Sequence, residues 1–199
     1  MEIEPKHQYQ HELGLDLSSL VDRFFLKAAN NAFQRDYILT YKKHREKNTF
    51  RFRAGGDGSF SYKHPAPFSE RNRKSESLNA RFATGLEKYY AFSDRFKMNY
   101  GAELLYHFRY SLTTFDNELG EYPEKTTNSH DFGVQLIVGF QFALKPRLII
   151  SSESGYRLRG QLAKSNYSFI NENNDRSEKS WIGSGFFIPS SGIFLSFLF

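Results

Sequence analysis

Three side chains on one segment are the strongest candidates for catalysis. Glu103, His107 and Ser111 supply a carboxylate, an imidazole and a hydroxyl group, the set used in acyl transfer. Because the segment alternates apolar and polar residues, the three groups would lie on one face of a strand, with successive members about 13 Å apart. A catalytic triad requires contacts of roughly 2.6–3.2 Å. These three residues therefore cannot form a triad among themselves, and a site would need partners from neighbouring strands.

The other motifs that could carry chemistry are weak. The remaining histidines lack the spacing of metal ligands and are His7, His11, His44, His64 and His130. The segment Ala54–Ser59 (AGGDGS) has a single aspartate and leads into a polar stretch, which favours a bulge over a calcium or phosphate site. No P-loop, dinucleotide fingerprint or nucleophile elbow is present. We therefore predict no catalytic residue, no cofactor and no metal, and favour a non-enzymatic protein.

Composition narrows the class of protein. The chain has 199 residues and a formal net charge of +5, and it contains 21 Phe, 12 Tyr and no Cys. The absence of Cys excludes a disulfide framework, and the positive charge permits anionic partners without choosing among them. No apolar run reaches the ~18–20 residues of a membrane-spanning helix. We expect a polar extension over residues 1–10 and a single domain over residues 11–199.

Apolar residues recur at every second position through most of the chain, which is the period of a β-strand. Eight segments show it: Leu13–Leu17, Tyr37–Tyr41, Phe50–Phe52, Leu78–Leu86, Met98–Tyr110, Phe132–Phe142, Leu148–Leu158 and Ile193–Phe199. Pro189 leaves the register upstream of the last strand open, because proline interrupts a strand ladder. Between Leu20 and Phe33 the spacing is closer to helical and predicts a short helix or a structured loop.

The links between these segments alternate in length. Short links are expected at His44–Asn48, Ser93–Arg95 and Lys145–Pro146, and long polar links at about Phe24–Arg35, Gly56–Ser77, Thr114–Ser129 and Lys164–Ser180. The alternation predicts an antiparallel, up-and-down sheet with both termini on the side of the short turns.

Volume indicates which face of the sheet points inward. An eight-stranded barrel is just wide enough to be filled by side chains, and about thirty large apolar groups would overfill it. Most glycines in the strands also lie on the polar face, where a narrow interior favours small residues. We therefore predict that the apolar face points outward to lipid, as in a membrane barrel. A soluble lipocalin-like barrel or a β-sandwich is the alternative, and it would bury the same face.

This orientation predicts where the charged residues of the strands lie. Each Arg on the lipid side at mid-depth would cost ~2–4 kcal/mol, and buried charges persist only when they are paired. We predict a network in the lumen that plugs it and leaves no open channel. Its predicted members are Glu12, Asp16, Arg51, Arg53, Arg81, Glu87, Glu103, His107, Arg109, Glu153, Arg157 and Arg159.

With these features the chain resembles small Gram-negative outer-membrane β-barrels of the OmpA/OmpX transmembrane-domain kind. Its last strand, with Ile193, Leu195, Phe197 and Phe199, resembles the insertion signal read by the barrel-assembly machinery. The segments GLEKYYAFSDRFKMNYGAELLY and SHDFGVQLIVGFQFALKPRLIISSESGY look like hairpins of uncharacterised barrels in this class. The resemblance implies an all-β, eight-stranded antiparallel transmembrane barrel in the outer membrane. It also implies short periplasmic turns, long extracellular loops, periplasmic termini and a signal peptide already removed.

Several functions remain open at this point. The leading hypothesis is a non-enzymatic structural or adhesion role, or an accessory subunit of a larger outer-membrane complex, acting through surface loops or lateral contacts. The alternatives are a lipid A acylhydrolase or acyltransferase, a narrow pore, and a soluble lipocalin-like binder.

Partners are expected from the envelope: outer-membrane lipid and lipopolysaccharide, the barrel-assembly machinery during insertion, and another outer-membrane protein. Nucleic acid is not expected as a partner, because the alternation places basic side chains and aromatic side chains on opposite faces of the strands. The basic run Arg71, Arg73 and Lys74 is a candidate surface-binding loop for lipopolysaccharide phosphates or a partner, with a solvated loop tip as the alternative.

Overall fold

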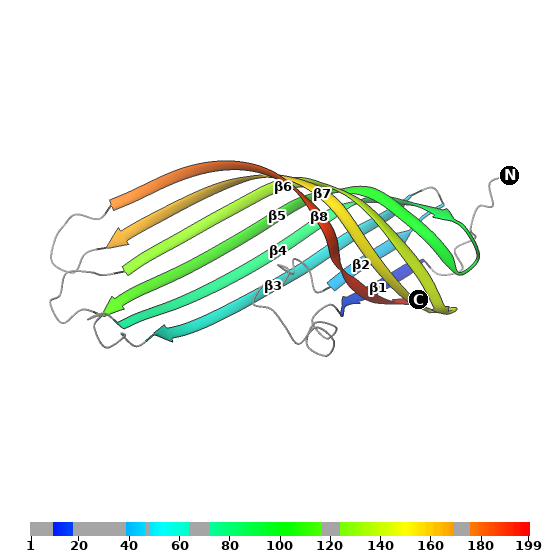
Figure 1. Cartoon of the computed structure of the whole chain (residues 1–199), viewed down its shortest axis with the longest axis horizontal. Helices are drawn as coiled ribbons and strands as arrows, with labels where there is room; N and C mark the ends of the chain where they lie inside the picture. The colour runs from blue at the N-terminus through cyan, green and yellow to red at the C-terminus, as the bar shows by residue number, and fades with distance from the viewer. Residues whose placement is uncertain (1–9, 18–38, 47, 64–71, 117–123, 169–175) are drawn as a thin grey trace.

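Eight antiparallel strands make up the protein, which we describe from a computed structural model. The structure describes residues 10–17, 39–46, 48–63, 72–116, 124–168 and 176–199. The strands are β1 (His11–Asp16), β2 (Leu39–His44), β3 (Thr49–Lys63), β4 (Asn72–Ala91), β5 (Phe96–Asp116), β6 (Glu124–Lys145), β7 (Leu148–Ser168) and β8 (Arg176–Leu198). Each strand pairs with the next, and β8 pairs with β1, so the sheet closes into an eight-strand ring (Figure 1). The prediction of an all-β, up-and-down arrangement is confirmed.

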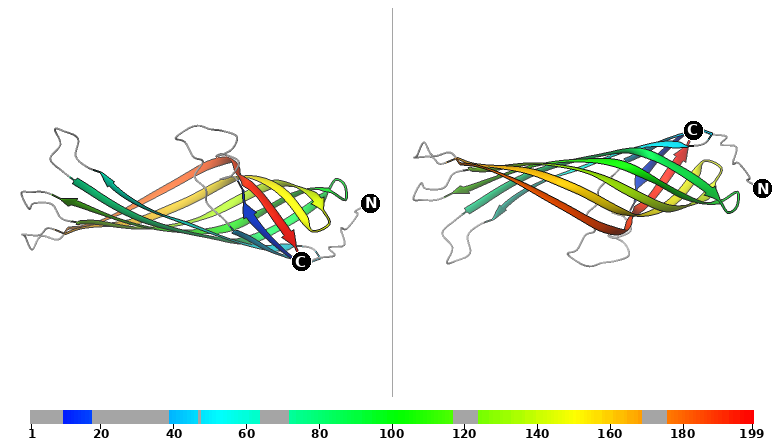
Figure 2. Two further views of the ribbon diagram at one scale, coloured as in Figure 1. Left: turned by 90° about the horizontal axis from the view of Figure 1, so that it is seen from below. Right: turned by 90° about the horizontal axis from the view of Figure 1, so that it is seen from above.

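Among the described residues, the ring is closed at one end only, because the strands differ in length. β1 and β2 have 6 residues each, whereas β4 to β8 have between 20 and 23. The β2–β3 ladder ends at Leu39 and Ala54, and the β1–β8 ladder ends at Asp16 and Phe194. Beyond these pairs, β3 to β8 continue together as a long curved sheet (Figures 1 and 2).

The short turns are confirmed, but three of the four long links were predicted too long, and the fourth, Phe24–Arg35, lies outside the described residues. β3 continues to Lys63 and β4 begins at Asn72, and the β5–β6 and β7–β8 pairs extend in the same way. Backbone pairing does not require apolar side chains, so serine- and threonine-rich stretches that lack alternation still extend the ladders. The expected helix between Leu20 and Phe33, the Tyr37 position of the second strand and residues 1–9 of the extension lie outside the described residues.

One irregularity lies in β8. Glu153 pairs with Gly192, but Gly155 pairs with Ile188, so three residues of β8 lie opposite the single residue Ser154. Pro189 is one of the three. Proline has no backbone N–H to donate to the ladder, which accounts for a bulge at the position where the sequence leaves the register open.

The apolar face points outward, as predicted. Tyr100, Leu136 and Phe197 are 44%, 58% and 48% exposed, whereas Arg51 and Arg53 are fully buried. Among the described residues, only Ala83, Ile137 and Phe194 are buried apolar side chains. The interior of the ring is therefore mainly polar. The described part of the chain contains no helix long and apolar enough to cross a membrane.

Candidate functional site

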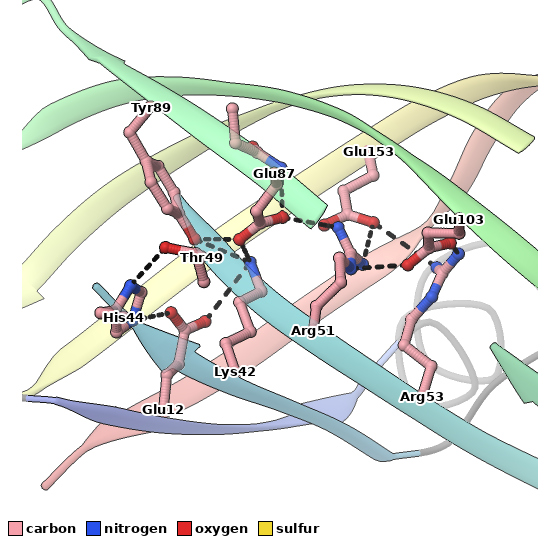
Figure 3. A network of polar contacts seen from close by, with 11 residues as sticks. Glu12, Lys42, His44, Thr49, Arg51, Arg53, Glu87, Tyr89, Glu103 and Glu153 are labelled. Atoms are coloured by element: carbon pink, nitrogen blue, oxygen red, sulfur yellow. Dashed lines mark hydrogen bonds and ion pairs between the residues drawn. The ribbon is translucent and has the colours of Figure 1, made fainter. Parts of the chain in front are cut away.

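A cluster of charged side chains fills the closed end of the ring (Figure 3). It arises because β1, β2, β3, β4, β5 and β7 each carry a charged residue at an inward position of the two-residue repeat. We define the interior charge cluster as Glu12, Lys42, Arg51, Arg53, Glu87, Glu103 and Glu153, all of them buried.

Arg51 is the centre of this cluster. Its Nη1 donates to Glu87 Oε2 at 2.8 Å, and its Nη2 donates to Glu153 Oε2 at 2.9 Å. Its Nε lies 2.6 Å from Glu103 Oε1. One guanidinium group thus contacts carboxylates from three strands, which uses the planar, multiply donating geometry that distinguishes Arg from Lys.

Two further cations complete the cluster. Lys42 Nζ lies 2.9 Å from Glu87 Oε1 and 3.7 Å from Glu12 Oε1. On the other side of Arg51, Arg53 Nη2 hydrogen-bonds Glu103, and its Nη1 lies 3.5 Å from Glu153 Oε2. The carboxylates therefore share cations, and the cluster forms one connected unit.

Polar side chains extend the cluster toward the short turns. His44 Nε2 lies 3.2 Å from Glu12 Oε2, and His44 Nδ1 lies 3.1 Å from Thr49 Oγ1. The Tyr89 hydroxyl donates to Glu87 and accepts from Lys42 Nζ at 3.3 Å.

A second, looser set of contacts lies nearer the long sheet. Arg157 donates from Nε and Nη2 to Gln135 Oε1 at 3.0 and 2.7 Å. Asp131 Oδ2 lies 3.2 Å from His107 Nδ1 and 3.4 Å from Arg159 Nη1. In addition, Arg81 Nη1 lies 3.1 Å from Asp57 Oδ2.

The buried charges balance. Within the described residues, the buried cations are Lys42, Arg51, Arg53, Arg81 and Arg157, and the buried carboxylates are Glu12, Glu87, Glu103, Asp131 and Glu153. A buried charge is tolerated when it is paired and hydrogen-bonded. The arrangement can cross-link the strands of the ring and occupy its interior.

The predicted network residues divide into three groups. Six of them form the cluster: Glu12, Arg51, Arg53, Glu87, Glu103 and Glu153. Arg81, His107, Arg157 and Arg159 belong to the second set of contacts, and Asp16 and Arg109 are half-buried. Sequence reasoning missed Lys42, His44, Tyr89 and Asp131. Lys42 and His44 could have been found, because they alternate with Leu39 and Tyr41 on the polar face of β2.

The three candidate catalytic residues on β5 contact different neighbours and do not come together. Glu103 is held by Arg51 and Arg53, whereas His107 contacts Asp131 of β6. Ser111 lies farther along β5, opposite Ser77 and Thr127. No group of three or more metal-ligating side chains occurs among the described residues.

The remaining predicted sites are the basic run Arg71, Arg73 and Lys74 and the insertion signal of the last strand. Arg71 is outside the described residues, whereas Arg73 and Lys74 lie in strand β4 and not in a loop. The exposed Lys74 Nζ is 2.9 Å from Glu76 Oε1. In the predicted insertion signal, Phe197 and Phe199 are exposed, and Ile193 and Leu195 are half-exposed.

Comparisons of the chain with protein-family models, curated proteins and solved structures found no match.

Proposed function

We propose that the protein is an outer-membrane β-barrel with a plugged polar interior and a non-enzymatic role. It acts as a structural or adhesion protein, or as an accessory subunit of a larger outer-membrane complex. The observation that carries this proposal is the inverted arrangement of side chains, with buried charges that balance inside and large apolar residues outside. Lipid is the solvent that favours this arrangement.

Aromatic residues mark both edges of the outward apolar surface. Near the short turns, Tyr90, Phe92, Phe96 and Phe140 form a row with ring centroids 5.1 to 5.8 Å apart. Toward the long sheet, the Tyr106 and Phe132 rings are 5.1 Å apart. Aromatic girdles at both interfaces are typical of outer-membrane barrels.

The distance between these edges fits a bilayer. Phe142 pairs with Phe96 of the row near the short turns. It is ten residues from Phe132 on β6, which corresponds to about 34 Å along the strand. At a tilt of about 40°, the separation along the membrane normal is about 26 Å, close to the ~25 Å apolar band of such barrels.

The strands continue well beyond this band. A tilted strand crosses a bilayer in roughly 9–11 residues, whereas β4 to β8 have 20 to 23. The surplus is rich in Ser, Thr and charged residues. This sheet would project from the membrane, so we assign contacts with a partner or a surface to it.

The first experiment tests the membrane assignment. The protein is refolded from urea with and without phospholipid vesicles, and heat-modifiable electrophoretic mobility and protease resistance are measured. We expect a compact, protease-resistant form with vesicles only. A stable monomer without lipid or detergent would contradict the proposal and favour a soluble binder. Purification of the native protein in mild detergent, with identification of the proteins that copurify, then tests the accessory-subunit role.

A hydrolytic function is the second candidate, and one observation favours it. Asp131 is within reach of His107 Nδ1, as in the orienting pair of a hydrolase. Incubation with lipid A separates the two functions, and we expect no loss of acyl chains. Turnover by the wild type that His107→Ala abolishes would establish the enzyme.

A further inference from the structure

Two lysines face each other across neighbouring strands on the outside of the sheet. Lys164 of β7 is the direct partner of Lys179 of β8, and both are exposed. Like charges directly opposite in an antiparallel pair are destabilising. Neither lysine forms an ion pair with another described residue, and Glu178, next in sequence to Lys179, pairs with Arg176. The pair therefore presents two positive charges with no acidic partner from the described part of the chain.

The lysines lie at the upper edge of the proposed membrane band. The outward pair immediately below them is Leu162 and Trp181. On β6 the same row contains Asn128, which pairs with Lys164. Trp is enriched at the interface between lipid and water, so the lysines are at the depth of lipid phosphates.

A shallow, open groove of about 500 Å³ lies below the lysine pair. Its apolar lining includes Phe132, Leu158 and Trp181, and its floor is formed by Gly160, Gly183 and Gly185. A Cβ on Gly160 would overlap the Trp181 ring, and a Cβ on Gly185 would lie 2.8 Å from Leu158 Cδ2. A Cβ on Gly183 would meet no atom within 4 Å, so the centre of the floor is open.

We propose that this surface binds one anionic lipid, with its phosphate between Lys164 and Lys179 and an acyl chain in the glycine-floored groove. The strand spacing of about 4.8 Å brings both ammonium groups within reach of one phosphate. The bound phosphate offsets the repulsion between the lysines, and the groove is apolar where the chain enters the membrane band. This inference rests on the proposed function, because the lipid is taken from the surrounding leaflet.

Native mass spectrometry of the protein in mild detergent tests the site. The probes are dimyristoyl phosphatidylglycerol and dimyristoyl phosphatidylcholine, which share acyl chains and differ in net charge. We expect the wild type to prefer phosphatidylglycerol. The double variant K164Q/K179Q should lose roughly tenfold or more in affinity for this lipid, since each interfacial lysine contributes about 1 kcal/mol toward anionic lipid. The matched control K43Q/K145Q removes the same charge at two exposed positions elsewhere and should retain the preference.

Gly183→Phe tests the groove separately. The open floor accepts the ring without a backbone clash, so the variant should fold, and its heat-modifiable mobility verifies this. It should weaken binding of both lipids while the lysines are intact. Equal phosphatidylglycerol affinity in the wild type and K164Q/K179Q would overturn the proposal, as would an equal loss in the control pair. If K164Q/K179Q or Gly183→Phe changed the oligomeric state without changing the bound lipid, the proposal would be overturned and the surface would be assigned to contact with a second copy of the chain.

The outcome is distinguishable from failure of the membrane assignment, because binding is measured without insertion into a bilayer. A protein that inserts into vesicles but shows no lysine-dependent lipid preference retains the proposed function and loses this site. A protein that is stable without detergent but still selects the anionic lipid through the lysines retains the site and loses the membrane assignment.

Discussion

Arg51 Nη2 donates to Glu153 Oε2 at 2.9 Å, although the two residues are 102 positions apart in the chain. Arg51 lies on β3 and Glu153 on β7, and these strands are not neighbours in the ring. The bond therefore crosses the interior and does not run along the wall (Figure 3). It explains how a ring with two strands of only six residues can be held closed at that end.

Removal of the central cation is the most direct test of this role. Arg51→Met leaves three buried carboxylates without their shared partner, and breaking a buried ion pair in this way costs about 3–5 kcal/mol. Arg159→Met, at a half-buried position, should cost about 1 kcal/mol or less. Urea unfolding in lipid vesicles measures both. Equal losses would show that the cluster does not hold the ring, and R51M/E153Q should recover part of the loss seen with R51M.

The charge cluster that occupies the interior also predicts whether the protein conducts ions. Because the guanidinium group of Arg51 contacts carboxylates from three strands, we expect no stepwise conductance in planar lipid bilayers. The variant R51A/E87A removes one cation and one carboxylate, keeps the formal net charge and should introduce a small leak. Conductance steps with the wild-type protein would contradict the plug and favour a pore.

The interior residues on most strands could be predicted from sequence because the two-residue repeat leaves only two faces. Once the volume of the apolar set rules out an inward placement, Arg51, Arg53 and Glu103 must lie inside. The partners of these residues could not be predicted. Contact between Arg51 and Glu153 depends on the closure and stagger of the ring, which no local pattern records.

The full length of the strands could not be predicted from the sequence pattern either. Alternation is visible only where one face is apolar, and it disappears in polar segments such as Lys74–Ser77 and Lys125–Ser129. The first of these is nevertheless paired, because Ser77 lies opposite Ser59 and their hydroxyl groups hydrogen-bond at 2.7 Å. Polar strands and polar loops have similar compositions. The outer part of the sheet beyond the ring was therefore predicted as loop.

Close approach of strands leaves no room for a side chain at the interior glycine Gly85. A Cβ on Gly85 would overlap the carbonyl oxygen of Ala102 and lie 2.8 Å from Glu103 Cα. Gly85→Ala should therefore destabilise the protein by about 1–3 kcal/mol, as overpacking does. Gly183→Ala is the matched control, because its Cβ enters open space, and should change stability by less than about 0.5 kcal/mol. Vesicle unfolding curves of equal midpoint would contradict the close packing at Gly85.

The stability cost of an arginine placed on the apolar face tests whether lipid or water covers that face. In lipid the cost depends on depth, and in water it does not. Leu136 and Leu162 are similarly exposed, at 58% and 48%, but Leu136 lies in the middle of the proposed band and Leu162 at its upper edge. Leu136→Arg should cost about 2–4 kcal/mol in vesicles and Leu162→Arg only about 0–1 kcal/mol. If water covered this face, both substitutions would be tolerated alike. Equal, small changes in the free energy of unfolding for the two variants would therefore contradict the membrane assignment, because an arginine at mid-depth in hydrocarbon must be destabilising.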